Sequence, residues 1–233
     1  QYKADELETA QVPPAAREEV RNTLADELKQ GNTLSTFGIQ VNNSAPPFDD
    51  VNIRKAFSAA MDRDAYVVGV LQGVGVPATA WVPPGIPGSD AERGIGFDAD
   101  QAKQYLADAE KYPNGEGMPA IKFMIADDTQ NLLIGEFVKA QAKDVLGIDI
   151  ELDVLEGAAY EERHNNGDFQ LALAGWGADY PDPDNWLPGQ FGTGASLNQY
   201  SYSNAEVDAL FDQASLELDN AKRIDLYGQA ETI

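Results

Sequence analysis

Cysteine is absent from the 233 residues, and histidine occurs only once. Without cysteine the chain has no thiolate nucleophile, no disulfide bond and no zinc site built on sulfur. Many exported bacterial proteins also lack cysteine, so its absence favours an exported protein without fixing the compartment. His164 lies in the polar stretch ERHNNGD, and we expect it to be a solvated surface residue with no evident partner.

Basic residues are scarce as well, because 16 lysines and arginines stand against 39 acidic residues and give a formal net charge of −23. A surface of this charge repels the phosphate backbone, which argues against nucleic acid as a partner. The expected partner is neutral or cationic. The acids act either as a solvated coat that favours solubility or as a field that steers a cationic ligand.

Long apolar runs are missing: none approaches the roughly 20 residues that a membrane helix needs, and nothing resembles a signal peptide. A targeting segment removed beforehand would leave no trace. The patterns G-x-x-x-x-G-K-[ST], G-x-G-x-x-G and G-x-S-x-G are also absent. We therefore expect neither a nucleotide cofactor nor a serine triad.

Alternating patterns predict an α/β fold. AIKFMIAD, IDIELDVLE and DFQLALAGW alternate apolar and polar residues as strands do, and LLIGEFVKAQAKDVLG between the first two is an amphipathic helix. Strand, helix and strand in this order form a βαβ unit with parallel strands. A short helix near AYEERHNN leads to the third strand, and TLSTFGIQVNN gives a further, imperfect strand signal. We predict a mixed, partly parallel sheet flanked by helices.

Polar capping residues mark where helices begin. Asp49 or Asp50 is placed to cap the helix that follows it, Asp98 begins a capping box, and Ser203 begins another before VDALFDQA. The Pro-rich stretch GVGVPATAWVPPGIPG is expected to be irregular.

The two ends of the sequence carry helical patterns. Pro13-Pro14 marks a helix start, and the helical pattern RNTLADELKQG ends at Gly31, which is placed to cap it. The last helix, AKRIDLYGQAETI, stops inside its amphipathic pattern without a cap. This pattern predicts that the sequence is a fragment of a longer protein.

The stretch GWGADYPDPDNW follows the last predicted strand. Pro181 and Pro183 interrupt the hydrogen-bond ladder of a strand, so the chain turns out over the carboxyl end of the strand, where open α/β sheets bind ligands. Asp179, Asp182 and Asp184 lack the spacing of an EF-hand, and we expect no metal site. A pair of carboxylates for glycoside hydrolysis cannot be identified among 39 acids from the sequence.

Several blocks together resemble the family 5 extracellular solute-binding proteins of ABC importers, of the oligopeptide- and dipeptide-binding type. In order, these are NNSAPPFDDVNIRKAFSAAMDRDAYV, VPATAWVPPGIPG, FDADQAKQYLADA, the βαβ segment, DFQLALAGWGADYPDPDNWL and YSNAEVDALFDQA. The resemblance covers the chain from about residue 36 to its end. It implies a periplasmic-binding-protein-like lobe, since members of this family close two lobes around a ligand by a hinge motion.

The resemblance also implies a division of the chain. Residues 36–233 resemble the second lobe, which stops before the return to the first lobe, and residues 1–35 resemble the tail of the preceding first-lobe segment. The missing first lobe would supply half of the binding cleft. A fragment of this kind is expected to fold and to bind peptides poorly.

The resemblance assigns candidate ligand-binding residues in the loop. In peptide-binding relatives an Asp three residues after the Trp binds the α-ammonium group of the ligand, and these positions are Trp176 and Asp179 here. Trp176 and Tyr180 would shield that carboxylate, and Trp186 and Asn198 are expected to border the cleft because they lie nearby in the sequence. Two alternatives stay open: Trp176 as a lid on the core, and Asp179 as a turn or capping residue.

The implied function is binding of oligopeptides, without catalysis or cofactor, for delivery to the permease of an ABC importer. The implied location is the periplasm or the outer face of the cell membrane, with membrane contact only through a lipid anchor outside this sequence. Related receptors hold dipeptides, nickel complexes, opines or oligosaccharides, and Trp81, Trp176 and Trp186 would also suit stacking on sugars. A secreted carbohydrate-active enzyme and an adhesion module are the alternatives from other classes.

Overall fold

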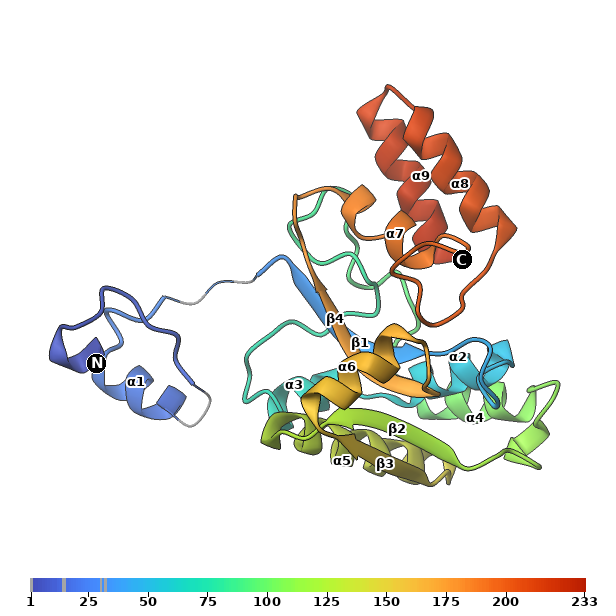
Figure 1. Cartoon of the computed structure of the whole chain (residues 1–233), viewed down its shortest axis with the longest axis horizontal. Coiled ribbons are helices and arrows are strands. Elements are labelled where there is room, and N and C mark those ends of the chain that lie inside the picture. The colour runs from blue at the N-terminus through green and yellow to red at the C-terminus, as the bar shows by residue number, and fades with distance from the viewer. Residues whose placement is uncertain (1, 14–15, 30, 32) are drawn as a thin grey trace. The chain divides into compact units, whose positions relative to one another are not determined.

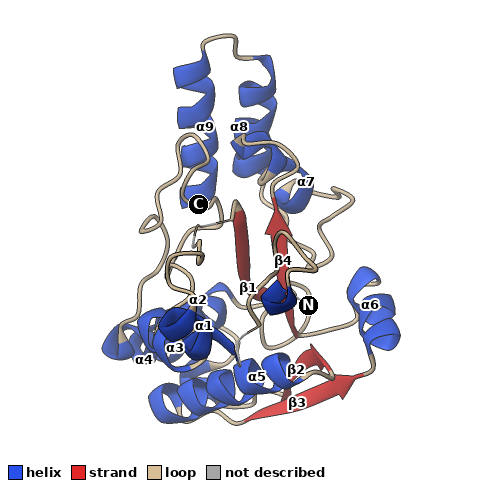
Figure 2. Ribbon diagram, turned by 90° about the vertical axis from the view of Figure 1, so that its left-hand side faces the viewer, coloured by secondary structure: helices blue, strands red, loops and turns tan. Residues whose placement is uncertain are grey.

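The computed structural model describes residues 2–13, 16–29, 31 and 33–233. The chain forms two compact units, Gln1–Thr33 and Leu34–Ile233, and each is described by itself. Figures 1 and 2 show the helices and strands of both units.

The first unit contains the 3-10 helix η1 (Tyr2–Ala4) and helix α1 (Arg17–Thr23). The predicted helix start at Pro13-Pro14 lies in part outside the described residues. Helix α1 ends well before the predicted cap at Gly31. The hydroxyl group of Thr23 donates a 2.8 Å hydrogen bond to the carbonyl oxygen of Glu19, and such bonds compete with continued helical hydrogen bonding.

A mixed sheet forms the centre of the second unit (Figure 1). Among the described residues it has four strands in the order β1-β4-β2-β3. Strand β2 (Ile121–Ala126) is parallel to both β3 (Ile150–Leu155) and β4 (Leu171–Gly177), while β1 (Ser35–Val41) runs antiparallel to β4. The predicted mixed, partly parallel sheet is confirmed.

The predicted βαβ unit is confirmed as well. Helix α5 (Thr129–Gln141) and its π-helical continuation η4 (Ala142–Leu146) connect β2 to the parallel strand β3. Helix α6 (Gly157–Asn165) then leads to β4. These connections put the carboxyl ends of β2, β3 and β4 at the same end of the sheet, and the loop after β4 leaves from that end.

Helices cover both faces of this sheet (Figure 2). Helices α2 (Val51–Ala60), α4 (Ala99–Ala107) and α5 enclose the larger core on one face, and α6 covers the other face. The larger core includes Phe57, Leu106, Phe123, Ile125, Ile134, Val138, Leu171 and Leu173. On the opposite face Met124 and Ala172 pack against Tyr160 of α6. This arrangement is a three-layer α/β/α unit.

Capping follows the sequence pattern with one correction. Asp50 caps α2, Asp98 caps α4, and Asp62 caps α3 (Arg63–Gly69), each through its carboxylate. Helix α8 (Ala205–Leu216) is capped by Asn204, so the predicted cap at Ser203 is wrong by one residue. The carboxamide oxygen of Asn204 accepts two backbone N–H groups of the first turn.

A short 3-10 helix, η3 (Pro113–Gly115), precedes β2.

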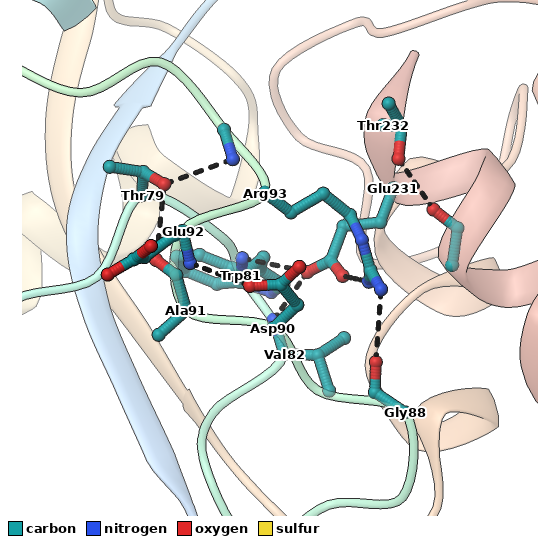
Figure 3. A network of polar contacts seen from close by, with 12 residues as sticks. Thr79, Trp81, Val82, Gly88, Asp90, Ala91, Glu92, Arg93, Glu231 and Thr232 are labelled. Carbon is teal, nitrogen blue, oxygen red and sulfur yellow. Dashed lines mark hydrogen bonds and ion pairs between the residues drawn. The ribbon is translucent and has the colours of Figure 1, made fainter.

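Residues 73–88, which were predicted to be irregular, have neither helix nor strand, and the same holds for the chain up to residue 98. This Pro-rich segment, residues 73–98, is fixed to the end of helix α9 (Asn220–Thr232) (Figure 3). Glu231 Oε1 accepts the backbone N–H groups of Trp81 at 2.9 Å and Val82 at 2.7 Å, and the second oxygen pairs with Arg93. Apolar side chains join the segment to α8 and α9, namely Val82, Ile86, Trp186, Leu187, Val207, Phe211 and Tyr227.

Candidate functional site

The loop after β4 carries most of the predicted site residues. The chain leaves β4 at Gly177, passes through the 3-10 helix η5 (Pro183–Asn185), and continues into α7 (Pro188–Phe191). Pro183 stands at the start of η5, where a missing N–H group costs nothing. Asp182 caps η5 by accepting the N–H group of Asp184 at 3.0 Å. The strand therefore ends before Pro181, as the prolines predict.

Two of the three acids in this loop are tied into the fold. Arg223 of α9 donates hydrogen bonds of 2.9 and 2.6 Å to the two carboxylate oxygens of Asp182. Asp184 accepts the hydroxyl groups of Tyr227 at 2.9 Å and Tyr180 at 2.8 Å. The hydrogen bonds from Arg223 lower the pKa of Asp182, and burial raises that of Tyr227. Both carboxylates therefore stabilise the loop.

Asp179 differs from these two acids. It is exposed, and no ion pair of the described residues includes it. Its Oδ2 atom accepts a 3.2 Å hydrogen bond from Nδ2 of Asn185, and its backbone N–H group donates to Oδ1 of Asn185 at 2.9 Å. The carboxylate therefore keeps its negative charge uncompensated by a cation and has one oxygen atom, Oδ1, without a partner among the described residues.

Strand β4 presents an unpaired edge next to this loop. Strand β2 lies opposite only the first two residues of β4, so the rest of that edge has no strand partner in the described part of the chain. Alternate residues of an antiparallel pair direct their main-chain groups at the partner strand. The N–H group of Ala178 donates to the carbonyl oxygen of Leu34, on the β1 side, at 2.8 Å. Since the side alternates from one residue to the next, the main-chain groups of Gly175 and Gly177 point to the open edge. Both glycines are exposed.

Trp176 lies between the loop and the core. Its indole ring is half-buried and packs against the core of the C-terminal helices, while its Nε1 atom donates a 3.2 Å hydrogen bond to Oδ1 of Asn185. It therefore covers the core and faces the loop at once. Tyr180 is 47% exposed, and the hydrogen bond that it donates to Asp184 raises its pKa.

The structure does not place Trp186 at the surface of this unit. Its side chain is 0% exposed, and its ring meets that of Trp81 edge-on with 6.4 Å between centroids. The predicted contact with a ligand is thereby corrected, because no atom of this side chain is accessible. Proximity to Asp179 in the sequence was its only support, and the turn of η5 directs the ring into the core.

Asn198 closes the loop between α7 and α8. Its Nδ2 group donates to the carbonyl oxygens of Gly192 at 2.9 Å and Tyr202 at 2.8 Å, and its Oδ1 atom accepts the N–H group of Tyr202 at 3.0 Å. The carboxamide is thus used within its own loop. Of the five predicted residues, the structure groups Trp176, Asp179 and Tyr180 around one loop.

His164 is not the solvated residue expected from the sequence. Its ring is half-buried and stacks between Phe169 and Tyr160, with ring centroids 5.5 and 5.8 Å away, and its Nε2 atom lies 2.7 Å from Oε1 of Gln40. Burial lowers the pKa of His164. The polar neighbours in ERHNNGD hid this packing, which depends on β1.

A cavity of about 340 Å³ lies against β1, the Pro-rich segment and the C-terminal helices. None of the five predicted residues lines it. Its walls are mostly apolar, with Arg54 and Glu231 among the few charged groups. Because the loop after β4 reaches these walls only through Leu187, and none of Trp176, Asp179 and Tyr180 does, we do not place the candidate site there.

Within the described residues, no group of three or more acidic or histidine side chains is arranged to hold a metal ion. No helix of the described ranges combines the length and the apolar character needed to cross a bilayer.

Sequence reasoning missed Asn185, which contacts both Trp176 and Asp179. The signal was present, because an asparagine after a Pro-Asp pair in a turn commonly bonds nearby backbone groups. It also missed Arg223, which lies 41 residues after its partner Asp182. No local pattern of the sequence predicts that pair.

Comparisons with known proteins give a consistent result. The sequence profile described as "Bacterial extracellular solute-binding proteins, family 5 Middle" matches residues 1–198. The oligopeptide-binding protein OppA of Bacillus subtilis is 32% identical over 100% of this chain and 44% of its own length. The dipeptide-binding protein DppE of the same organism is 30% identical with the same two coverages. By name these relatives are binding proteins.

The fold is shared with a solved structure. A periplasmic oligopeptide-binding protein (OppAIV) from Borrelia burgdorferi superposes with a TM-score of 0.85 at 32% sequence identity, over 100% of this chain and 46% of that one. The chain therefore spans less than half the length of the relatives that it matches.

Proposed function

Because the chain belongs to family 5 of the bacterial extracellular solute-binding proteins, we propose that it forms one lobe of a receptor that binds oligopeptides for an ABC importer. In this proposal residues 36–233 are the second lobe, and residues 1–35 are the tail of the preceding first-lobe segment. The break between the compact units at residues 33 and 34 supports a boundary close to this position. The remaining lobe supplies the opposite wall of the cleft.

The observation that carries the proposal is the exposed carboxylate of Asp179 beside the open edge of β4. Asp182 and Asp184 are satisfied by Arg223 and two tyrosines, whereas Asp179 has no cation partner among the described residues. A peptide brings a cation of the required kind in its α-ammonium group. A charge-assisted hydrogen bond to Asp179 Oδ1 fixes the amino end of the ligand.

The open edge of β4 fits the rest of a peptide. Gly175 and Gly177 direct main-chain N–H and C=O groups outward, and an extended peptide satisfies such groups by adding as a strand. Main-chain hydrogen bonds are independent of the ligand's sequence. The receptor therefore accepts varied peptides and selects chiefly for a free amino terminus.

The carbohydrate alternative has less support. Stacking on sugars needs exposed aromatic rings, but Trp186 is fully buried and Trp81 packs edge-on against it. Trp176 alone of the three faces the loop. For a glycosidase, two facing carboxylates are needed, whereas Asp182 and Asp184 are held by hydrogen bonds within the fold. Binding without catalysis is therefore our proposal.

The proposed partners follow from this role. The ligand is an oligopeptide, and the receiving partner is the permease of an ABC importer. The proposed location is the periplasm or the extracellular face of the membrane, as the description of the family implies.

Calorimetry on the full-length protein tests the proposal. A peptide pool and one selected peptide are titrated in two forms, with a free and with an acetylated amino terminus. We expect Asp179→Asn to weaken binding of the free-amino peptide by roughly 10- to 100-fold, as for the loss of one hydrogen bond to a charged group. Acetylation of the ligand should produce a loss of the same order.

Asp212→Asn is the matched control, because Asp212 is an exposed acid on α8 outside the loop, and its replacement should leave the affinity unchanged. The chain of 233 residues alone should bind the same peptide much more weakly than the full-length protein, since one wall of the cleft is absent. Unchanged affinity in Asp179→Asn would remove this residue from the site, and turnover of a glycoside would refute a pure binding role.

A further inference from the structure

We propose that Asn185 is a positioning residue that holds the ligand anchor Asp179 and the indole ring of Trp176 in one fixed arrangement. This inference rests on the proposed function, since it assigns a role to Asn185 in the same site. Asn185 does not touch the ligand in this proposal. It acts through the side chains that it binds.

Three hydrogen bonds converge on the carboxamide of Asn185. Its Oδ1 atom accepts Nε1–H of Trp176 at 3.2 Å and the backbone N–H group of Asp179 at 2.9 Å. Its Nδ2 group donates to Oδ2 of Asp179 at 3.2 Å. One side chain thus fixes the backbone of the anchor, the orientation of its carboxylate, and the ring beside it.

The arrangement requires a carboxamide. An acceptor is needed for the two N–H groups, and a donor is needed for the carboxylate of Asp179; asparagine supplies both on one short side chain. The bond to Oδ2 leaves Oδ1 of Asp179 for the ligand. It also does not neutralise the carboxylate, so the full negative charge stays available to an ammonium group.

Asn185 is itself held in place. It is the last residue of η5, whose cap Asp182 is bound by Arg223 through two hydrogen bonds. Within the same turn Asp184 accepts the hydroxyl group of Tyr227. Helix α9 therefore fixes the short helix that carries Asn185, and Asn185 in turn fixes Asp179. A preorganised anchor loses less conformational freedom when a ligand binds.

The test compares a free-amino peptide with its acetylated form on the full-length protein. Asn185→Ala should weaken binding of the free-amino peptide by roughly 3- to 10-fold, the factor expected when one side chain has to be ordered on binding. Binding of the acetylated peptide should change by less than about twofold, because the anchor contributes little to it. In the Asp179→Asn background, Asn185→Ala should have little further effect.

Asn204→Ala is the matched control, because this asparagine also holds a turn by accepting two N–H groups but lies at the start of α8. It should lower the melting temperature and leave the ratio of the two affinities unchanged. Melting curves of the Asn185→Ala variant are recorded to check that it is folded at the temperature of the titration.

The outcomes separate the two proposals. If neither form of the peptide binds the full-length protein, the proposed function fails and the role of Asn185 fails with it. If the parent binds the free-amino peptide and Asp179→Asn does not weaken that binding, Asp179 is not the anchor and only the role of Asn185 is refuted. If Asp179→Asn weakens binding but Asn185→Ala does not, or if Asn185→Ala weakens both peptides equally, only the positioning role is refuted. Selective loss for the free-amino peptide, absent in the double variant, supports it.

Discussion

Arg223 of helix α9 binds both carboxylate oxygens of Asp182, which lies 41 residues earlier in the loop after β4. Both side chains are about one-quarter exposed, so the pair is partly shielded from water. Two parallel hydrogen bonds between a guanidinium and a carboxylate are stronger and more directional than a single contact. The ion pair therefore connects the C-terminal helices to the loop that carries Asp179.

Replacing Arg223 by glutamine tests this connection. The change leaves Asp182 partly buried and without its cation, and we expect the free energy of unfolding to fall by about 1–3 kcal/mol. Urea denaturation of the variant and of Lys222→Gln measures the effect, since Lys222 is exposed on the same helix. Equal stability of the two variants would mean that the ion pair adds nothing to the fold.

The sheet and most helices could be predicted because their signals are local. Alternation over six or seven residues identified the strands, and the order of strand, helix and strand determined which of them are parallel. The cap of α8 was misplaced by one residue because Ser203 and Asn204 are both good capping residues. Sequence alone does not say which of two adjacent caps the backbone selects.

The site could be predicted only in part, because side-chain direction depends on distant contacts. Asp179 and Trp176 were found through a resemblance in the motif around them. Asp182 differs from Asp179 because Arg223 on α9 pairs with it, and that contact has no local signature in the sequence. Trp186 follows Asn185 in the chain, yet it turns into the core.

Gly175 and Gly177 allow a test of the packing between β1 and β4, because the two glycines share a strand but differ in their surroundings. A Cβ atom on Gly175 would lie 2.4 Å from the ring of Phe37 and 2.8 Å from the carbonyl oxygen of Thr36, whereas nothing lies within 4 Å of one on Gly177. Gly175→Ala should therefore lower stability by about 1–3 kcal/mol. Gly177→Ala should fold with stability within about 0.5 kcal/mol of the parent. Thermal unfolding of both variants decides, and equal melting temperatures would contradict the close approach of Phe37.

His164 should make stability depend on pH. Burial between Tyr160 and Phe169 lowers its pKa, so the unfolded chain binds the proton more readily than the folded one. This contribution to stability is present above the ordinary histidine pKa of about 6.5 and is lost as the pH falls through that value towards the lowered one. Urea denaturation from pH 8 to pH 5 should show this loss, and His164→Gln should flatten the profile. The chain has no other histidine, so an unchanged slope in the variant would show that His164 is not responsible.

Glu231 allows the charge of a buried carboxylate to be separated from its role as an acceptor (Figure 3). Its side chain is only 6% exposed, and it binds Arg93 and the N–H groups of Trp81 and Val82. Glu231→Ala leaves Arg93 unpaired and two N–H groups unsatisfied, and it should cost about 3–5 kcal/mol. Glu231→Gln retains an acceptor oxygen for the N–H groups and loses only the ion pair, so its cost should be clearly smaller.

Thr232→Ala on the same turn removes one hydroxyl group that donates to the carbonyl oxygen of Gly228 and serves as the control for the helix end. Urea denaturation ranks the three variants, and equal losses in the Ala and Gln variants of Glu231 would show that the charge, rather than the acceptor, holds the Pro-rich segment on α9.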